Sequence, residues 1–294
     1  MHEGGSDLVM KKRKVMERAK LLLFIVMIIM TLLYGINKWL LYSKYDKSSP
    51  EITFQKELLE VSVSTTEEEL LADVKAVDKK DGDVTDTIII ESMSKMLEDN
   101  QRIVTYAAFD KDNHVGKAER RIRYTDYTGP RFSLDAPLSA NSASAEISEN
   151  LEPLHASDSI DGDLTNQIVV INTEMLSMTA ESIEMEYEVQ VTNSSGDMAS
   201  IKLPVKVSLD GKGAGSGLSS VELSEYLTYR KVGEPIDLGA FITSVMMDGQ
   251  PVGGEVVQIS SDLDTSQPGV YTATYTVNGM TASASTNLII VVEE

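Results

Sequence analysis

The chain has 294 residues and a formal net charge of −20, and it contains no cysteine. The absence of cysteine excludes disulfides, thiolate metal sites, cysteine nucleophiles and a lipid-accepting cysteine. Basic residues gather in residues 1–20, so the remainder is more acidic still, and nucleic acid is excluded as a partner because phosphate binding needs a basic face. The length is typical of two or three domains.

The first predicted element is a membrane helix. Residues 21–36 are apolar apart from Thr31, Tyr34 and Gly35, and the apolar pattern resumes at Trp39. A spanning helix needs roughly 20 residues, which predicts a transmembrane signal-anchor at residues 21–42, in contact with membrane lipid. The basic residues before it are Lys11, Lys12, Arg13, Lys14, Arg18 and Lys20. They predict a cytoplasmic tail at residues 1–20, too short to fold alone, with the C-terminal part extracellular.

Two other interpretations of this segment remain open. A cleaved signal peptide needs small residues at a cleavage site, and residues 37–47 offer no such pattern. A buried core helix would not carry this charge asymmetry on its flanks. We therefore expect a single-pass protein of the cell membrane.

The pattern after residue 50 predicts short strands. Runs such as residues 59–63, 103–106 and 201–207 alternate apolar and polar side chains, and Gly, Asn, Asp and Pro separate them. Such spacing is typical of antiparallel β-sandwiches. One short helix is predicted at residues 66–72, where Thr66 caps a run of glutamates.

A sequence motif occurs twice. Residues 76–85 read AVDKKDGDVT and residues 156–165 read ASDSIDGDLT. A β-branched strand and a hairpin follow each copy, at Asp110 in the first and Asn193 in the second. The repeat predicts two related modules.

A third module follows a glycine-rich linker. Pro268 and Gly269 predict a turn, a strand of alternating Tyr, Val and Thr follows, and residues 288–292 predict a last strand. The domain organisation expected from the N-terminus is a linker at 43–50, Ig-like domain 1 at 51–126, Ig-like domain 2 at 127–208, the glycine-rich linker at 209–219 and Ig-like domain 3 at 220–294.

These motifs resemble a known group of proteins. The D-x-x-D-G-D-[VL]-T loop with its hairpin is similar to the HYR-like and cadherin-like Ig repeats of bacterial surface proteins, and the P-G-V-Y segment resembles bacterial Ig-like domains. The resemblance implies an all-β fold of tandem Ig-like antiparallel sandwiches behind one N-terminal transmembrane helix. It does not select among stalk, adhesive and accessory roles.

The acidic loops are the candidate site. They contribute Asp78, Asp81 and Asp83 in the first copy and Asp158, Asp161 and Asp163 in the second. Clustered carboxylates suit Ca²⁺, and the hairpins offer further ligands at Asp110 and Asp112, or at Asn193 and Asp197. In the alternative interpretation the loops are tight turns, where glycine takes a positive φ and aspartates bond backbone amides.

Catalysis has no support in the sequence. The histidines His2, His114 and His155 are scattered, and no nucleophile elbow, P-loop or zinc-protease motif occurs. We therefore expect no enzyme and no cofactor besides calcium. Glu184 and Glu186 are expected at exposed strand positions. The methionines Met175, Met178, Met185 and Met198 are expected to fill a core, with a promiscuous binding surface as the alternative.

The sequence indicates a membrane-anchored structural or binding protein of the cell surface, with a stalk or adhesion-type role. The third module is expected to move on its tether and to engage a protein or glycan ligand. The alternative is a non-catalytic accessory subunit of a secretion, pilus or cell-wall assembly machine. The ligand and the oligomeric state are left open.

Overall fold

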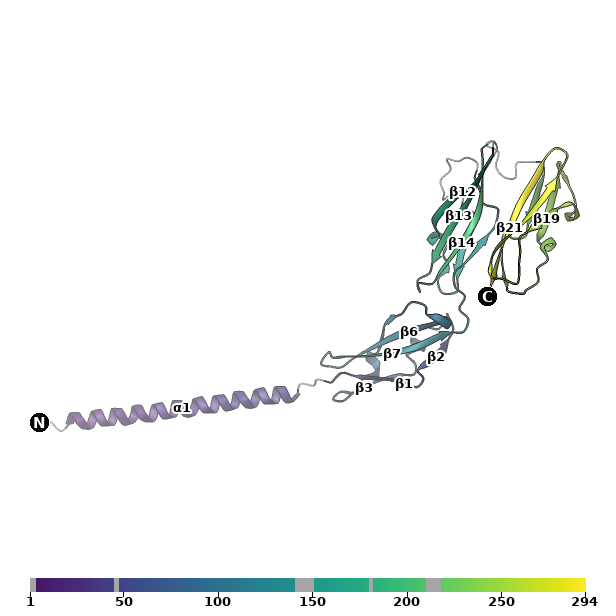
Figure 1. Cartoon of the computed structure of the whole chain (residues 1–294). Helices are drawn as coiled ribbons and strands as arrows, with labels where there is room; N and C mark the ends of the chain where they lie inside the picture. The colour runs from purple at the N-terminus through teal and green to yellow at the C-terminus, as the bar shows by residue number, and fades with distance from the viewer. Residues whose placement is uncertain (1–3, 45–47, 141–150, 180–181, 210–217) are drawn as a thin grey trace. The chain divides into compact units, whose positions relative to one another are not determined.

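The computed structural model describes residues 4–44, 48–140, 151–179, 182–209 and 218–294 (Figure 1). One long helix precedes a series of β-sheets, which confirms the prediction of all-β Ig-like domains behind an N-terminal helix. The chain divides into two compact units. The first comprises Met1–Glu57, Glu67–Ser92 and Val104–Arg120, and the second comprises Leu58–Thr66, Met93–Ile103 and Arg121–Glu294.

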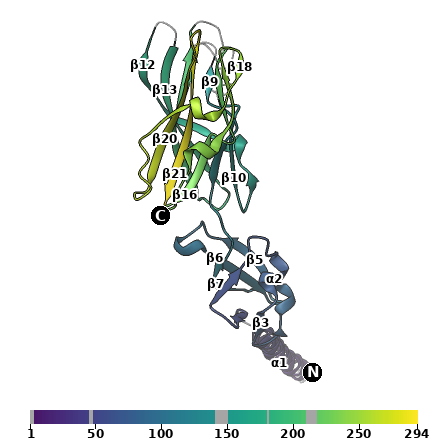
Figure 2. The ribbon, with the colours of Figure 1, turned by 90° about the vertical axis from the view of Figure 1, so that its right-hand side faces the viewer.

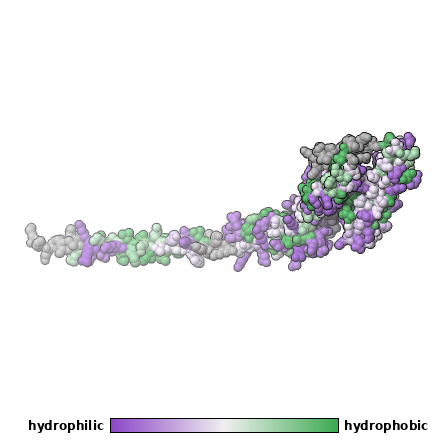
Figure 3. All heavy atoms as spheres, turned by 45° about the horizontal axis from the view of Figure 1, so that its top comes forward, coloured by the Kyte–Doolittle hydropathy of each residue, from purple (hydrophilic) through white to green (hydrophobic). Residues whose placement is uncertain are grey.

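Helix α1 (Gly4–Lys44) is longer than the predicted span. The helix includes the basic tail, against the expectation that this tail is too short to fold. It continues there because no helix-breaking residue separates the tail from the apolar run. Within the described residues, α1 is the one helix long and apolar enough to cross a membrane, over Met10–Leu41. Figure 3 shows its basic part in purple followed by the apolar part in green.

The strands that follow form three modules, each with two sheets (Figure 2). In the first module one sheet has the order β1-β3-β4 and the other β2-β7-β6-β5. The short helix α2 (Glu67–Leu71) lies between β2 and β3, where the sequence predicted it. The strands are β1 (Glu51–Phe54), β2 (Leu58–Val61), β3 (Val74–Asp78), β4 (Gly82–Asp83), β5 (Ile89–Met93), β6 (Gln101–Phe109) and β7 (Val115–Tyr124).

The second module repeats this arrangement, with sheets β8-β10-β11 and β9-β14-β13-β12. Its first four strands are β8 (Arg131–Leu134), β9 (Ser139–Ala140), β10 (Leu154–Asp158) and β11 (Gly162–Asp163). The last three are β12 (Val169–Met178), β13 (Ser182–Thr192) and β14 (Met198–Ser208). The relative strand order is the same as in the first module, as the sequence repeat indicated.

The third module has the sheets β15-β17-β18 and β16-β21-β20-β19, which is again the same order. Its strands are β15 (Ser220–Leu223), β16 (Leu227–Lys231), β17 (Ile242–Met247), β18 (Gln250–Pro251), β19 (Gln258–Ser261), β20 (Gly269–Asn278) and β21 (Ser283–Glu293). The sequence left this strand order open, because the third module lacks the repeated acidic motif. In every module the second strand pairs in parallel with the last, as β2 with β7, β9 with β14 and β16 with β21.

Period-two alternation places one face of each strand in a core. On β13, Tyr187, Val189 and Val191 are buried. On the opposite face Glu184 is exposed, as predicted, whereas Glu186, also expected to be exposed, is half-buried. The buried residues of the second and third modules form one cluster.

The expectation that four methionines fill the core was wrong for three of them. Met175, Met178 and Met198 are 59%, 64% and 57% exposed, and only Met185 packs against the core. Met175 and Met178 lie on β12, which is an edge strand of its sheet and has two register shifts. A side chain on such an edge has neighbours on one side only, and composition does not reveal this.

The second and third modules lie side by side in the same compact unit (Figure 1). The Tyr226 amide donates to the Leu134 carbonyl at 3.2 Å, and the Phe132 amide donates to the Tyr229 hydroxyl at 2.9 Å. Arg131 pairs with Glu293, and its guanidinium lies 4.7 Å from the centre of the Tyr229 ring. Of the expected glycine-rich linker at 209–219, residues 210–217 lie outside the described residues. These bonds join the third module to the second, and the expected movement of the third module stays a prediction.

Candidate functional site

The first acidic loop joins β3 to β4 through a tight turn. Asp78 Oδ1 accepts hydrogen bonds from the Lys80 amide at 2.8 Å and the Asp81 amide at 2.9 Å. Gly82 follows with a φ of 78°, a left-handed conformation that glycine adopts without strain. Asp78 therefore organises the turn, as the second interpretation of the motif requires.

Asp83, the last carboxylate of the motif, has a different place. Its Oδ1 accepts from the Thr85 amide at 3.0 Å, at the start of a short 3₁₀ helix, Thr85–Thr87. Hydrogen bonds from the Thr85 hydroxyl and amide lower the pKa of Asp83. Asp83 is exposed, and this local bond to Thr85 separates its role from that of the other carboxylates of the loop.

Three other carboxylates come together at this loop. One oxygen from each of Asp78, Asp81 and Asp110 lies within 4.8 Å of the others. Asp110 follows β6, and its side chain is fully buried. The hairpin thus folds over the loop and adds Asp110, which the sequence offered as a further ligand. Asp112, offered with it, pairs with Lys80 instead.

His114 holds Asp110 in position. Its amide donates to Asp110 Oδ1 at 2.7 Å, and its Nδ1 lies 2.6 Å from Oδ2. Burial alone would raise the pKa of Asp110, but the bonds from the His114 side chain and amide outweigh it, so this pKa is lowered and the carboxylate is charged. His114 was not expected at this site, although its spacing of four residues from Asp110 across a turn was an available signal.

Carboxylates at this separation suit a hard divalent cation, because oxygen ligands that are gathered before binding need little rearrangement. Asp78, Asp81 and Asp110 are the residues that would hold it. These carboxylates already accept main-chain bonds, and the Lys111 amide donates to Asp81 Oδ2 at 3.1 Å. A carboxylate offers about four lone-pair sites on its two oxygens, so one side chain can accept turn bonds and still bind a cation.

The second acidic loop has the same turn but a different third member. Asp158 Oδ1 accepts from the amides of Ile160 at 3.1 Å and Asp161 at 2.6 Å. Here Asn193 stands at the place of Asp110, and its Nδ2 donates to Asp158 Oδ2 at 2.5 Å. An amide nitrogen thus lies where the first loop has a carboxylate, and in the described residues the clustered carboxylates occur at the first loop alone.

The remaining residues offered by the second loop make local bonds. Asp161 accepts from both the amide and the hydroxyl of Ser194 at 2.6 Å, and Asp163 caps the Thr165 amide at 2.9 Å. Asp197 Oδ2 accepts from the Tyr127 hydroxyl at 2.7 Å. Burial, with the bond to Asp197, raises the pKa of Tyr127 to about 12, so this phenol stays protonated.

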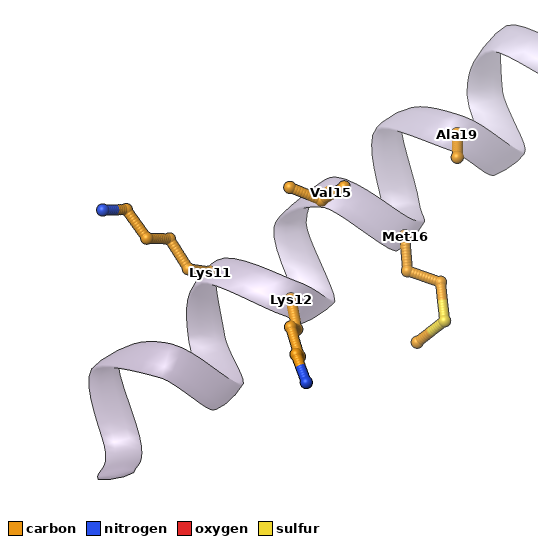
Figure 4. Close-up of a pocket in the computed structure, with 5 residues that line it drawn as sticks. All are labelled: Lys11, Lys12, Val15, Met16 and Ala19. Carbon is orange, nitrogen blue, oxygen red and sulfur yellow. The ribbon is translucent and has the colours of Figure 1, made fainter. Parts of the chain in front are cut away.

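A shallow hollow on α1 is the side of a single exposed helix. Lys11 and Lys12 lie one turn from Val15 and Met16, and Ala19 follows one turn later (Figure 4). All five side chains project from the helix, and none of them faces another element. The hollow is therefore a basic and apolar helix surface, with no enclosed site.

Comparisons with known proteins identify no family. No family model and no curated protein matches the sequence. Among solved structures, the M60 catalytic domain with CBM51-1 and CBM51-2 from Clostridium perfringens ZmpB is 13% identical, with a TM-score of 0.22, and covers 84% of this chain. Human CDH23 EC21-23 is 11% identical, with a TM-score of 0.21, and the match covers 83% of this chain and all of that one.

Mouse Cadherin-23 EC22-24 is 13% identical, with a TM-score of 0.19, and the match covers 84% of this chain and 99% of that one. This chain spans 31% of the length of the ZmpB structure.

Proposed function

We propose that the chain is a non-catalytic, membrane-anchored protein of the cell surface that presents three Ig-like modules outside the cell, in a stalk or adhesion-type role. The observation that supports this proposal most strongly is the exposure of the apolar part of α1. Its apolar part has no protein neighbour, since none of the candidate span is buried. An exposed apolar helix of this length is costly in water and favourable in a bilayer.

The flanks of the helix support one orientation. The basic residues of 11–20 precede the apolar part, and Trp39 follows it at the opposite end. Lysine and arginine favour the cytoplasmic side, and tryptophan favours the interface. The acidic β-modules then lie outside the cell.

The composition of the modules fits a surface role. They are acidic, and their sequence has no cysteine and no nucleophile elbow, P-loop or zinc-protease motif. Ig-like sandwiches are rigid carriers on which loops and edges bind partners. The alternative, an accessory subunit of an envelope machine, shares the anchor and differs in its partner.

The absence of cysteine makes a direct test of topology available. We would introduce Lys12→Cys or Glu119→Cys, both at exposed positions, and treat intact cells with a membrane-impermeant maleimide. We expect Glu119→Cys to react in intact cells and Lys12→Cys to react only after lysis. A tag on the N-terminus should remain attached to the membrane fraction after alkaline extraction.

Labelling of Lys12→Cys in intact cells would overturn the proposed orientation. Loss of the N-terminal tag with release of the modules would instead identify a cleaved signal peptide. The unmodified chain, with no thiol to react, is the control.

A further inference from the structure

A cleft lies between the second and third modules. It has a volume of about 620 Å³, within the range of roughly 300–1,000 Å³ that is usual for ligand sites. Both modules belong to one compact unit, and the bonds of Arg131 and Tyr229 described above join them. The cleft is therefore bordered by two modules that are held together.

Two strand edges border this cleft. Residues 203–206 of β14 line it from the second module, and residues 284–287 of β21 line it from the third. The partner β9 covers only Lys206 and Val207 of β14, and β16 begins its pairing with β21 at Ile289. Over the described residues, positions 203–205 of β14 and 284–287 of β21 thus have no strand partner on this side, where they meet the cleft.

Unpaired strand edges bind extended peptides. The main-chain groups of an incoming strand complete the ladder, and its alternate side chains enter pockets on either side. Pro204 on β14 lacks an amide N–H, so the β21 edge at Ser285 and Asn287 offers the more complete set of donors and acceptors. Ile289 donates its amide toward β16, and the alternation of a strand turns the amides of Asn287 and Ser285 to the same side.

The charges in the cleft favour a basic partner. Glu184 and Glu222 line it, against one cation, Lys206. Lys206 lies opposite Glu184 in the β13–β14 register, which leaves Glu222 as the carboxylate in excess. The rest of the chain is also strongly acidic, with a net charge of −20 overall.

We propose that the cleft between the second and third modules binds an extended basic peptide, which pairs with the exposed edge of β21 and places a lysine or arginine at Glu222. The binding role proposed above thereby acquires a location in the fold, and the inference rests on that role. The lining has hydroxyl and amide groups but a single aromatic ring, Tyr226, which is buried, so stacking on a sugar ring has little surface.

The test uses the full chain in nanodiscs and a fluorescent peptide in which lysine and valine alternate over eight residues. We expect saturable binding that weakens at least tenfold with Ser285→Trp, which fills the cleft. Ser283→Trp, on the same strand but outside the cleft, is the matched control and should bind as the unmodified chain does. Unchanged melting temperatures would show that both variants are folded.

A second experiment exchanges the charges of the cleft and the peptide, so its result does not depend on filling the cleft with a larger side chain. Glu222→Lys should weaken the lysine peptide at least tenfold and strengthen a matched peptide in which glutamate replaces lysine. Equal binding of both peptides to both proteins would overturn the proposal. So would a chitin oligosaccharide that binds the unmodified chain and is blocked by Ser285→Trp, because the cleft would then be a glycan site.

The peptide-binding assay does not depend on which side of the membrane the modules lie. A chain that failed the cysteine-labelling test would still bind the peptide if the cleft is a peptide site. Failure of one proposal is therefore distinguishable from failure of the other.

Discussion

Arg120 is one of the largest fully buried side chains among the described residues, and its charged guanidinium lies inside the first module. Its two terminal nitrogens donate to Asp73 Oδ1 at 2.6 Å and Oδ2 at 2.8 Å. The guanidinium also lies 5.4 Å from the centre of the Phe54 ring. The pair holds β7 against the start of β3 and fixes which arginine of the Arg120–Arg123 run faces inward.

Removing the acidic partner should be costly. We expect Asp73→Ala to lower the free energy of unfolding by about 3–5 kcal/mol, because Arg120 would stay buried without a counter-charge. The measurement is urea unfolding at pH 7. In the Asp73→Ala background, Arg120→Met should restore part of the stability, and no restoration would show that the loss came from elsewhere.

The same pair makes the stability of the folded chain depend on pH. The hydrogen bonds from Arg120, opposed by burial, lower the pKa of Asp73 in the folded chain. A carboxyl with a lowered pKa contributes stability that is complete above its unfolded value of about 3.9 and is lost as pH falls through the folded value. The Asp73→Ala variant should therefore lose less stability than the unmodified chain between pH 5 and the acid transition.

The carboxylate cluster at Asp78, Asp81 and Asp110 predicts a response of stability to calcium. Calcium that binds the native state alone stabilises it by about 2.7 kcal/mol at a concentration of 100 Kd. We expect the transition of the first module to rise in millimolar calcium relative to EDTA, and Asp110→Asn to abolish the rise. That substitution copies the second loop, where Asn193 stands.

The reciprocal substitution is the control. Asn193→Asp supplies the missing carboxylate beside Asp158 and Asp161 and should add a calcium response to the second module. Identical melting of the unmodified chain in calcium and in EDTA would leave both loops as turns.

At the scale of elements, β7 approaches the chain that enters β1 very closely. A Cβ atom built on Gly116 would lie 1.8 Å from the Pro50 carbonyl oxygen, so only glycine fits. We expect Gly116→Ala to cost about 1–3 kcal/mol or more, because the backbone of one strand must move. Thermal unfolding by circular dichroism measures it.

Gly254→Ala provides the comparison for this prediction. A Cβ atom built on Gly254 would lie 3.4 Å from Ile242 Cγ2, an ordinary contact, and the φ of Gly254 is not positive. A similar loss of stability in both variants would mean that the close approach at Gly116 is not the cause.

Much of the element pattern was predictable, because it rests on local signals. Alternation predicted β13 and β20, and the capped glutamate run predicted α2. The repeated motif indicated that the first two modules share a strand order. The turn geometry of Asp78 and Gly82 follows from residue type alone, so it too was accessible.

The rest depends on contacts between distant residues. Whether Met175 is buried depends on β12 lying at an edge, and the place of Asp110 beside Asp78 depends on how the hairpin folds. Asn193 differs from aspartate only in having an NH₂ group in place of one carboxylate oxygen. That group donates a hydrogen bond to Asp158, where a carboxylate oxygen could bind a cation. The cleft had no signal in the sequence, because its two walls come from different modules.

At the scale of the whole molecule, the contact between the second and third modules predicts shared unfolding. Calorimetry should show them in one transition, since Phe132 and Tyr229 join them through a partly buried hydrogen bond. Tyr229→Phe leaves the Phe132 amide without its partner, at a cost of about 1–3 kcal/mol. Combined with Arg131→Ala, it should separate the transition into two.

Tyr271→Phe is the control for this experiment. Its hydroxyl donates to the Gln267 carbonyl within the third module, so it should lower stability without separating the modules. Two transitions in the unmodified chain would contradict the shared unfolding.

The parallel pairing of the second strand with the last has a mechanical consequence. When the N-terminus is anchored and a ligand pulls on the far end, the two strands of such a pair are drawn in opposite directions along their length. The load then falls on all rungs of the ladder together, so the hydrogen bonds must break in shear. The third module has five paired positions in this ladder, the first has four and the second has two, over Leu227–Lys231, Leu58–Val61 and Ser139–Ala140. In a chain anchored as proposed, the third module would therefore resist such a pull best and the second module least.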